Sequence, residues 1–153
     1  IRHSEFVSFE KNRVIRFTEG LQYENFTEDA KLALEQTMYT MTAQSDRMGC
    51  RLSGEPLRLK ERKEMLSEAV TAGTIQIPNN GLPIVLLADC QTTGGYPKIG
   101  QVISVDLPRV AQLRPGEAIQ FKKISPQEAE HLYLQREWLF RQLQIGIALK
   151  IRN

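Results

Sequence analysis

The most restrictive feature of the sequence is a short, almost wholly apolar run, Leu82–Ala88, between two turn-forming segments. Asn79-Asn80-Gly81 precedes it and supplies residues that tolerate positive φ, which is typical of a tight turn. The polar, glycine-bearing segment Asp89–Pro97 follows it and is expected to be a loop. A run of this kind between turns predicts a β-strand that is buried on both faces. Its uninterrupted part, Ile84–Ala88, is the longest apolar run of the chain and is far shorter than the ~20 residues that a membrane span needs.

Further segments have the composition of short β-strands, and two have the pattern of helices. β-Branched and aromatic residues, or strict alternation, predict strands at Val14–Phe17, Tyr39–Gln44, Leu57–Lys60, Thr74–Ile77, Ile99–Val105 and Ala118–Ile124. Helices are predicted over Glu28–Met38 and from Ser125 past Phe140, with one helical turn in Asp106–Leu113. These elements predict a mainly β (α+β) domain, which is a barrel or a sandwich with helices attached.

Both predicted helices begin with capping residues. Thr27 has the chemistry of an N-cap, and the two acidic residues after it favour the positive end of a helix dipole. Ser125 and Glu128 form a capping-box pattern, with a proline at the first helical position. Apolar residues of the second helix recur at helical spacing: Leu132, Tyr133, Leu139, Phe140 and Leu143. We expect this helix to pack on its own barrel, and the alternative is that the helix and its tail, Ile145–Ile151, dock a partner.

Length and charge bound the class of protein. A chain of 153 residues suits one domain, and an apolar fraction of 41% is too high for a disordered chain. Its 20 basic and 18 acidic residues nearly cancel and are interspersed, so composition does not support binding to a polyanion. The chain begins with Ile1 rather than Met, so we expect it to be part of a longer protein. We expect a single domain over residues 1–153, with residues 1–12 and 145–153 at its periphery.

Cysteine and histidine are scarce in this chain. The cysteines are Cys50 and Cys90, and the histidines are His3 and His131. Because a zinc site needs several clustered ligands, we expect no metal site. Each thiol is expected to be a small buried side chain, while a catalytic Cys–His pair and a Cys50–Cys90 bridge stay open as alternatives. Two cysteines and no export signal indicate a cytoplasmic protein.

The segment Asp89–Pro97 carries most of the chemistry. It combines a carboxylate, an amide, hydroxyls, a phenol and two adjacent glycines. The glycines let a ligand approach the backbone N–H groups closely. Asp89, at the end of a buried strand, is expected to be rigid and partly desolvated, as a general base or a substrate anchor requires. The alternative is a polar turn whose side chains satisfy its own backbone, and the residues alone do not favour either interpretation.

A second dense cluster is Ser45–Arg51, whose polar residues are typical of a loop. Arg47 and Arg51 lie four positions apart with a glycine between them, so together they can clamp a carboxylate or a phosphate. Equally, Arg47 can pair with Asp46 or Glu55 as an ordinary surface charge. Weaker candidates, each beside a predicted turn where a polar side chain is expected anyway, are Glu68, Gln76 and Asn80.

These clusters belong to a longer set of motifs that extends over about residues 13–143. The set includes Ser45-Asp46-Arg47-Met48-Gly49, Gly73-Thr74-Ile75-Gln76-Ile77-Pro78, Asn80-Gly81-Leu82-Pro83-Ile84-Val85-Leu86 and Gln91-Thr92-Thr93-Gly94-Gly95-Tyr96-Pro97. On these motifs the chain resembles the carboxy-terminal portion of the KipA family. This family is also called the allophanate hydrolase subunit 2, 5-oxoprolinase C-subunit or biotin-dependent carboxyltransferase family.

The resemblance implies a cyclophilin-like β-barrel with one early helix and a long carboxy-terminal helix. Members are longer than this chain, so it resembles the carboxy-terminal half of a family member. The implied partners are a KipI-like protein and a LamB/YcsF-like protein, which are the other two components of the same complex. The implied reaction of that complex converts 5-oxoproline to glutamate at the expense of ATP.

The family usually has an aromatic residue at position 50 and a small residue at position 90. This chain departs from both patterns with Cys50 and Cys90. Because the family's reaction does not need a thiol at position 90, the second departure argues against a nucleophilic Cys90.

Three functions follow from the resemblance. The first is a part of an ATP-dependent 5-oxoprolinase or of an allophanate hydrolase-like amidohydrolase, with no cofactor bound within this chain and little activity for this part alone. The second is a biotin-dependent carboxyltransferase that acts on urea or a small amide, with carboxybiotin on a separate carrier. The third is a non-catalytic regulator that binds a KipI-like protein and antagonises it.

The enzymatic hypotheses assign roles to particular residues. Asp89 orients or deprotonates the amide or lactam, neighbouring polar groups bind its carbonyl, and the arginines neutralise a carboxylate or phosphate. The residues expected to act in catalysis are Asp89, Gln91, Thr92 and Thr93. Those expected to bind substrate are Arg47, Arg51, Gln76, Asn80, Gly94, Gly95 and Tyr96.

Overall fold

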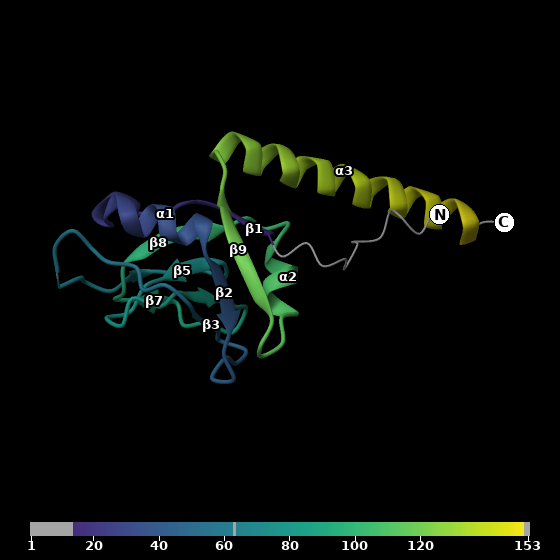
Figure 1. Ribbon diagram of the computed structural model, residues 1–153. Helices are drawn as coiled ribbons and strands as arrows, with labels where there is room; N and C mark the ends of the chain where they lie inside the picture. Colours follow the sequence, from purple (N-terminus) through teal and green to yellow (C-terminus); the bar gives the residue numbers. More distant parts are fainter. Residues whose placement is uncertain (1–13, 63, 152–153) are drawn as a thin grey trace.

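The computed structural model describes residues 14–62 and 64–151, so His3 and the stretch 1–12 that we expected at the periphery lie outside the described residues. Seven strands of the described chain close into a barrel in the order β1-β8-β5-β6-β3-β2-β9 (Figure 1). Their bounds are β1 Val14–Glu19, β2 Met38–Met41, β3 Gly49–Ser53, β5 Thr74–Gln76, β6 Ile84–Leu86, β8 Lys98–Val102 and β9 Ala118–Lys123. The predicted mainly β fold is confirmed, and of the two predicted architectures the barrel is correct.

The barrel closes because its first strand pairs with two strands that are distant in sequence. β1 runs antiparallel to β8, with Phe17 opposite Val102. It runs parallel to β9, with Ile15 opposite Phe121. The other neighbouring strands of the barrel are antiparallel. Full closure leaves no edge strand in the barrel, and this protects even its three-residue strands from pairing with another chain.

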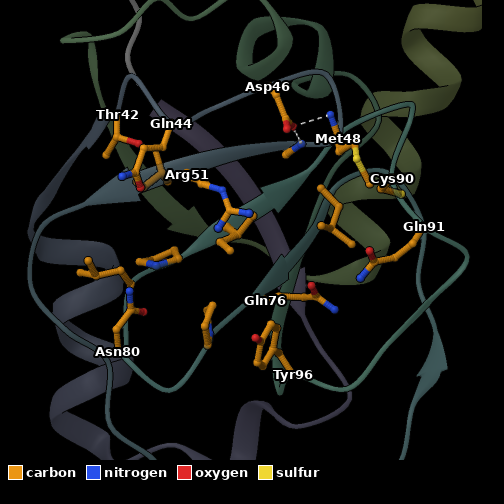
Figure 2. A pocket seen from close by; sticks show the side chains of 17 residues that line it. Thr42, Gln44, Asp46, Met48, Arg51, Gln76, Asn80, Cys90, Gln91 and Tyr96 are labelled. Atoms are coloured by element: carbon orange, nitrogen blue, oxygen red, sulfur yellow. Dashed lines mark hydrogen bonds between the residues drawn. The ribbon is translucent and has the colours of Figure 1, made fainter.

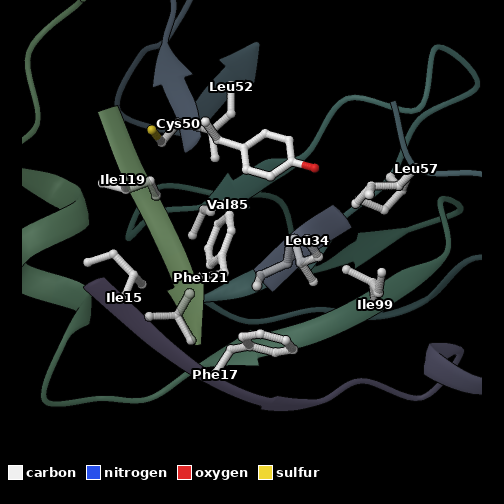
Figure 3. Close-up of a cluster of buried hydrophobic side chains, with 14 of the residues drawn as sticks. Ile15, Phe17, Leu34, Cys50, Leu52, Leu57, Val85, Ile99, Ile119 and Phe121 are labelled. Atoms are coloured by element: carbon white, nitrogen blue, oxygen red, sulfur yellow. The ribbon is translucent and has the colours of Figure 1, made fainter. Parts of the chain in front are cut away.

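Buried side chains from all sides of the barrel meet in one hydrophobic cluster (Figure 3). The rings of Phe17 and Phe121 are perpendicular with centroids 6.1 Å apart, and the ring of Tyr39 lies 5.9 Å from that of Phe121. The Tyr39 hydroxyl donates a hydrogen bond of 2.9 Å to the carbonyl of Glu55. Aromatic contacts of this geometry add to the stabilisation from burial, so they hold β1, β2 and β9 together. Further members of the cluster are Ile15, Leu34, Leu52, Ile75, Val85, Ile99 and Ile119.

A second sheet of two short strands lies outside the barrel. It consists of β4 (Glu68–Ala69) and β7 (Thr93–Gly94), which are antiparallel with Glu68 opposite Gly94. The sequence predicted that Asp89–Pro97 is wholly a loop, and this prediction is wrong for the two residues of β7. Neither strand has a local signal, because each consists of two residues and is defined by its partner alone.

The helices near the barrel begin and end largely as predicted. The Thr27 hydroxyl accepts a hydrogen bond of 3.1 Å from the N–H of Ala30, so the predicted N-cap is confirmed. The first α-helix stops before the predicted Met38, because Met38 already pairs with Gln120 of β9. The helical elements that precede β9 are the 3-10 helix η2 (Tyr23–Asn25), α1 (Glu28–Gln36) and α2 (Leu107–Ala111).

The last helix, α3 (Pro126–Ile151), projects from the barrel (Figure 1). The N–H of Glu128 donates to the hydroxyl of Ser125 at 3.1 Å, as the capping pattern predicted. At 1.5 Å per residue this helix is ~39 Å long, and its 26 residues are apolar on more than one face. No described helix, α3 included, is long and apolar enough to cross a membrane.

The expectation that α3 packs on its own barrel is wrong for much of the helix. Tyr133 and Phe140, which we expected to pack inward, are 42% and 45% exposed, and Trp138 is 64% exposed. The guanidinium of Arg136 donates to the carbonyl of Ser104 at 2.9 Å, which ties the helix to the residues after β8. Because the apolar residues do not share one face, a single barrel surface cannot cover them all.

Other boundaries also differ from the sequence-based predictions: the predicted strands Tyr39–Gln44 and Ile99–Val105 end at Met41 and Val102. Leu57–Lys60 is not a strand and forms one isolated bridge, between its Leu59 and Phe26. The cluster Ser45–Arg51 is not all loop, because β3 begins at Gly49. The buried strand β6 is shorter than predicted, since its ladder with β3 ends at Leu86.

A partly buried ion pair joins β1 to the residue before α2. The carboxylate of Asp106 is 1% exposed and accepts three hydrogen bonds from Arg16: from the backbone N–H at 2.9 Å, from Nε at 2.8 Å and from Nη2 at 2.7 Å. The hydrogen bond to Asp106 raises the pKa of Arg16 above its ordinary value, although burial of the guanidinium acts to lower it. A two-pronged guanidinium–carboxylate contact of this kind fixes orientation as well as distance.

We predict that Asp106→Asn lowers the free energy of unfolding by about 2–3 kcal/mol, because it removes the counter-charge of Arg16 and Arg109 at a partly buried site. The measurement is urea denaturation of the two proteins. Asp29→Asn, which changes an exposed carboxylate in the first turn of α1 in the same way, is the control and should cost less than about 1 kcal/mol. Equal losses in the two variants would contradict the role given to the buried pair.

Candidate functional site

A pocket of about 280 Å³ opens beside the strands β3, β5 and β6 (Figure 2). β3 and β5 both pair with β6, so side chains from three segments of the sequence reach one place. Arg51 of β3, Gln76 of β5 and Ile84 of β6 line the pocket, and the loops add Asn80 and Tyr96. The other polar or sulfur-bearing side chains of the lining are Thr42, Gln44, Asp46, Met48, Cys90 and Gln91.

The structure separates the predicted site residues into two groups. Those that line the pocket are Arg51, Gln76, Asn80, Gln91 and Tyr96. Those that do not line it are Arg47, Asp89, Thr92, Thr93, Gly94 and Gly95. Most of the predicted substrate-binding side chains therefore meet in one pocket, whereas three of the four residues that we expected to act in catalysis lie outside its lining.

Gln76 is the most unusual side chain of this pocket. It is 2% exposed, and within the described part of the chain its Nε2 has no hydrogen-bond partner. An unpartnered buried amide costs about 1–3 kcal/mol. The register of β5 against β8 shifts between Ile75 and Gln76, and a shift of this kind redirects the side chains beside it. The Gln76 amide rests against Gly94, where any Cβ would collide with Nε2.

Sequence reasoning missed two polar residues of the pocket, Thr42 and Gln44, and gave Asp46 a different role. The Thr42 hydroxyl is buried and has no hydrogen-bond partner among residues 14–62 and 64–151. Asp46 Oδ1 accepts from the N–H groups of Met48 at 2.8 Å and Gly49 at 3.1 Å, so this carboxylate holds the turn before β3 (Figure 2). The spacing Asp-x-x-Gly is a turn signal that identifies Asp46, whereas nothing local distinguishes Thr42 or Gln44.

Asp89 lies at the surface rather than in a desolvated position. Its Oδ2 is 3.4 Å from Nε of Arg47, and the two side chains are 56% and 84% exposed. The expectation that Asp89 is partly desolvated is wrong, because β6 ends at Leu86 and the chain leaves the barrel before it reaches Asp89. Arg47 forms a surface ion pair, as one interpretation held, but its partner is Asp89 rather than Asp46 or Glu55.

The two thiols differ in environment. Both cysteines are free, so the open question of a bridge is answered. Cys50 is fully buried, and burial raises the pKa of its thiol to about 11, against a smaller opposing effect of Ser45. Cys90 is partly exposed and lines the pocket. The hydrogen-bond partner of His131 is Gln135 on α3, so His131 is not paired with either thiol.

Comparison with known proteins places this fold among carboxyltransferase domains. The family described as "Carboxyltransferase domain, subdomain A and B" matches residues 2–123. The chain is 43% identical over 131 residues to the C subunit of 5-oxoprolinase from Haemophilus influenzae, with 86% of this chain aligned. It is 38% identical over 129 residues to the same protein from Escherichia coli, with 84% of this chain aligned. The aligned part covers 42% of each relative, so the chain spans less than half of their length.

A solved structure contains the same fold. The crystal structure of the Kluyveromyces lactis urea carboxylase matches 81% of this chain and 12% of that chain, with a TM-score of 0.76 and 22% identity. At this level of identity the likeness concerns the fold alone. It shows that a barrel of this kind also occurs as a small part of a much larger enzyme.

We predict that a thiol reagent such as Ellman's reagent at pH 8 modifies one cysteine in the native chain and two after unfolding. Burial keeps the reagent away from Cys50 and raises the pKa of its thiol to about 11, so this thiol stays protonated at pH 8. Cys90→Ser should abolish the native reaction, and Cys50→Ser should leave it unchanged. Native modification that persists in Cys90→Ser would contradict the assignment.

Proposed function

The chain belongs to the family of carboxyltransferase domains, subdomains A and B, and from this premise we propose that it forms the substrate-binding part of the C subunit of a 5-oxoprolinase. The complex would open the lactam ring of 5-oxoproline to give glutamate, with ATP as a co-substrate. The identities of 43% and 38% to two proteins of that name support the assignment. Because the chain spans 42% of those relatives, a complete site is expected to need the remainder of such a protein together with its partners.

The observation that carries the proposal is the unpartnered Nε2 of Gln76 in the pocket. The carbonyl oxygen of a lactam or amide can accept a hydrogen bond from this N–H. Binding would then satisfy a donor whose isolation costs the empty protein about 1–3 kcal/mol. The buried hydroxyl of Thr42 is a second donor without a partner in the described chain, and it lines the same pocket. Two such groups in one pocket support recognition of a small polar molecule.

The charge of the pocket supports a substrate with a carboxylate. The guanidinium of Arg51 lines the pocket, and no ion pair of Arg51 is formed within residues 14–62 and 64–151. Asp46, the acidic residue of the lining, already accepts two backbone N–H groups. A guanidinium binds a carboxylate with two parallel hydrogen bonds. 5-Oxoproline carries one carboxylate beside its lactam, and the volume of about 280 Å³ suits a ligand of this size.

We place Asp89 at the rim of the site. Its neighbours in sequence, Cys90 and Gln91, line the pocket, and its backbone N–H lies 3.4 Å from the carbonyl of Arg47. Ring opening breaks the lactam C–N bond, so water must add to the carbonyl carbon and a proton must reach the leaving nitrogen. Asp89 is proposed to move that proton once the rest of the complex covers it, since its own chain leaves it exposed. Thr92 and Thr93 are proposed to contact the covering surface.

A second candidate function is carboxyl transfer to a small amide such as urea, and the carboxyltransferase description of the family favours it. The same pocket would bind the amide carbonyl through Gln76, and carboxybiotin would enter on a separate carrier protein. The polar lining of the pocket suits an uncharged amide as well as a lactam, but Arg51 would then lack a substrate carboxylate.

The deciding experiment reconstitutes the protein that contains this chain with its expected partners, a KipI-like protein and a LamB/YcsF-like protein. ATP-dependent release of glutamate from 5-oxoproline would establish the lactamase function. Dependence on a biotinylated carrier and on urea would establish carboxyl transfer instead. Binding of the partners with neither reaction would favour a regulatory role.

We predict that Gln76→Met raises the KM for 5-oxoproline by about 10- to 100-fold and leaves stability unchanged or higher. The variant removes the donor to the substrate and, in the empty protein, an unpartnered buried amide. Gln101→Met is the matched control, because the amide of Gln101 is satisfied by the carbonyl of Ala72 and the hydroxyl of Thr74. This control should lose stability and keep the KM. A Gln76 variant with unchanged KM would remove the assigned role.

We predict that Asp89→Asn in the assembled complex lowers kcat by at least about 100-fold, because the amide cannot exchange the proton. The melting temperature should hardly change, since surface ion pairs contribute ~0–1 kcal/mol. Arg47→Gln, which breaks the same ion pair from the other side, is the control and should keep most of the activity. Full activity of Asp89→Asn would refute the catalytic role.

A further inference from the structure

A buried ammonium lies beneath the two-stranded sheet β4–β7. Lys98 begins β8, its side chain is 5% exposed, and its Nζ lies 2.9 Å from Oε2 of Glu68 on β4. A buried charge is costly unless it is paired and hydrogen-bonded, so a lysine at position 98 requires this contact for the fold to be stable. The contact is also the link between the barrel, which carries Lys98, and the outer sheet, which carries Glu68.

Gln22 completes this contact from a third segment of the chain. Its side-chain Nε2 donates to the same Oε2 of Glu68 at 3.1 Å, and its Oε1 accepts from the backbone N–H of Lys98 at 3.0 Å. Its own backbone N–H donates to the carbonyl of Lys98 at 3.1 Å. Gln22 is 9% exposed and the Lys98 side chain 5%, so both donors are buried, whereas the Glu68 side chain that accepts from them is 41% exposed. Oε2 of Glu68 therefore accepts hydrogen bonds from Lys98 and Gln22, and these two residues are also hydrogen-bonded to each other.

The pairing registers lead from this cluster back to the pocket. Glu68 is opposite Gly94 across the β4–β7 sheet, and Gly94 is the residue that rests against the amide of Gln76. Gln76 is in turn opposite Lys98 across the β5–β8 pairing. The four residues thus form a closed circuit of two strand pairings, one ion pair and one close packing contact. The ion pair holds the outer sheet at the point where Gln76 enters the pocket.

We propose that Lys98, Gln22 and Glu68 are positioning residues that clamp the β4–β7 sheet onto the barrel, and so place Gly94 against Gln76 and Tyr96 at the wall of the pocket. As a role in substrate binding, this rests on the function proposed above. None of the three lines the pocket, so they act through Gly94, Gln76 and Tyr96 rather than on the substrate.

The clamp matters for the outer sheet because the pairing within this sheet is short. Each of its strands has two residues, and an isolated two-stranded sheet is at best marginally stable in water. Beyond the sheet, the N–H of Val70 donates to the carbonyl of Thr92 at 3.0 Å. The hydrogen bonds from Lys98 and then from Gln22 lower the pKa of Glu68, so its carboxylate is ionised at neutral pH.

The test compares local and global opening in the chain with Glu68→Gln. This variant removes the counter-charge of the ammonium and keeps the size of the side chain. Hydrogen exchange at the Val70 amide should become at least about tenfold faster, while exchange at barrel amides such as Val102, which donates to Gly73, should rise much less. In the assembled complex the KM for 5-oxoproline should rise by about tenfold or more, with a smaller change in kcat.

Two further variants separate positioning from stability. Glu24→Gln is the matched control, because Glu24 also binds a lysine, Lys31, at 2.8 Å and has its pKa lowered mainly by that contact. It should change neither Val70 exchange nor the KM. Glu68→Gln combined with Lys98→Met removes the unpaired buried charge, so its melting temperature should recover from that of the single variant. Its fast Val70 exchange and raised KM should persist, because the clamp is still absent.

The outcomes decide the two proposals separately. Unchanged Val70 exchange in Glu68→Gln, or recovery of both exchange and KM in the double variant, would overturn the positioning role. A wild-type complex that does not act on 5-oxoproline would overturn the proposed function. In that case the exchange data, together with the NMR signal of the Gln76 side-chain amide in Glu68→Gln, still test the clamp. An unshifted Gln76 signal with fast Val70 exchange would show that the sheet does not position Gln76.

Discussion

The buried contact between Arg16 and Asp106 is the interaction on which the rest of the structure depends. It fixes β1 against the segment that begins α2, and β1 is the strand that closes the barrel between β8 and β9. A buried carboxylate stabilises through an ion pair only when the geometry is excellent, and here the Asp106 carboxylate accepts a backbone N–H and both prongs of a guanidinium. Closure then holds β8, β5, β6 and β3 in register, and these strands carry Lys98, Gln76 and Arg51.

The candidate site shows how stability is given up where binding is expected. The barrel satisfies most of its buried polar groups, yet Gln76 and Thr42 keep unpartnered atoms in the described chain, and both line the same pocket. Exceptions of this kind are informative because buried polar groups are otherwise hydrogen-bonded. The surrounding structure accommodates the Gln76 amide through Gly94, where no side chain fits. The outer sheet that supplies this glycine is small, and the contacts of Glu68 with Lys98 and Gln22 connect it to the barrel.

Local signals predicted the elements whose causes are local. The N-cap at Thr27 and the cap at Ser125 were predictable because each rests on a hydrogen bond within one turn. Elements defined by a distant partner were not: Leu57–Lys60 alternates like a strand but has one bridge, and β7 exists only because β4 lies opposite. The exposed apolar residues of α3 were also missed, because spacing alone does not say whether a surface is near enough to cover them.

By itself the sequence determined the mainly β fold, the family and most of the polar groups that line the pocket, because composition, capping and motifs are properties of short segments. Only the tertiary structure decided which of these groups meet. Gln76 was a weak candidate beside a turn and lines the pocket with an unpartnered Nε2, whereas Asp89 was the leading candidate and lies at the surface with Arg47. Burial and cross-strand register caused this exchange, and both depend on residues far away along the chain.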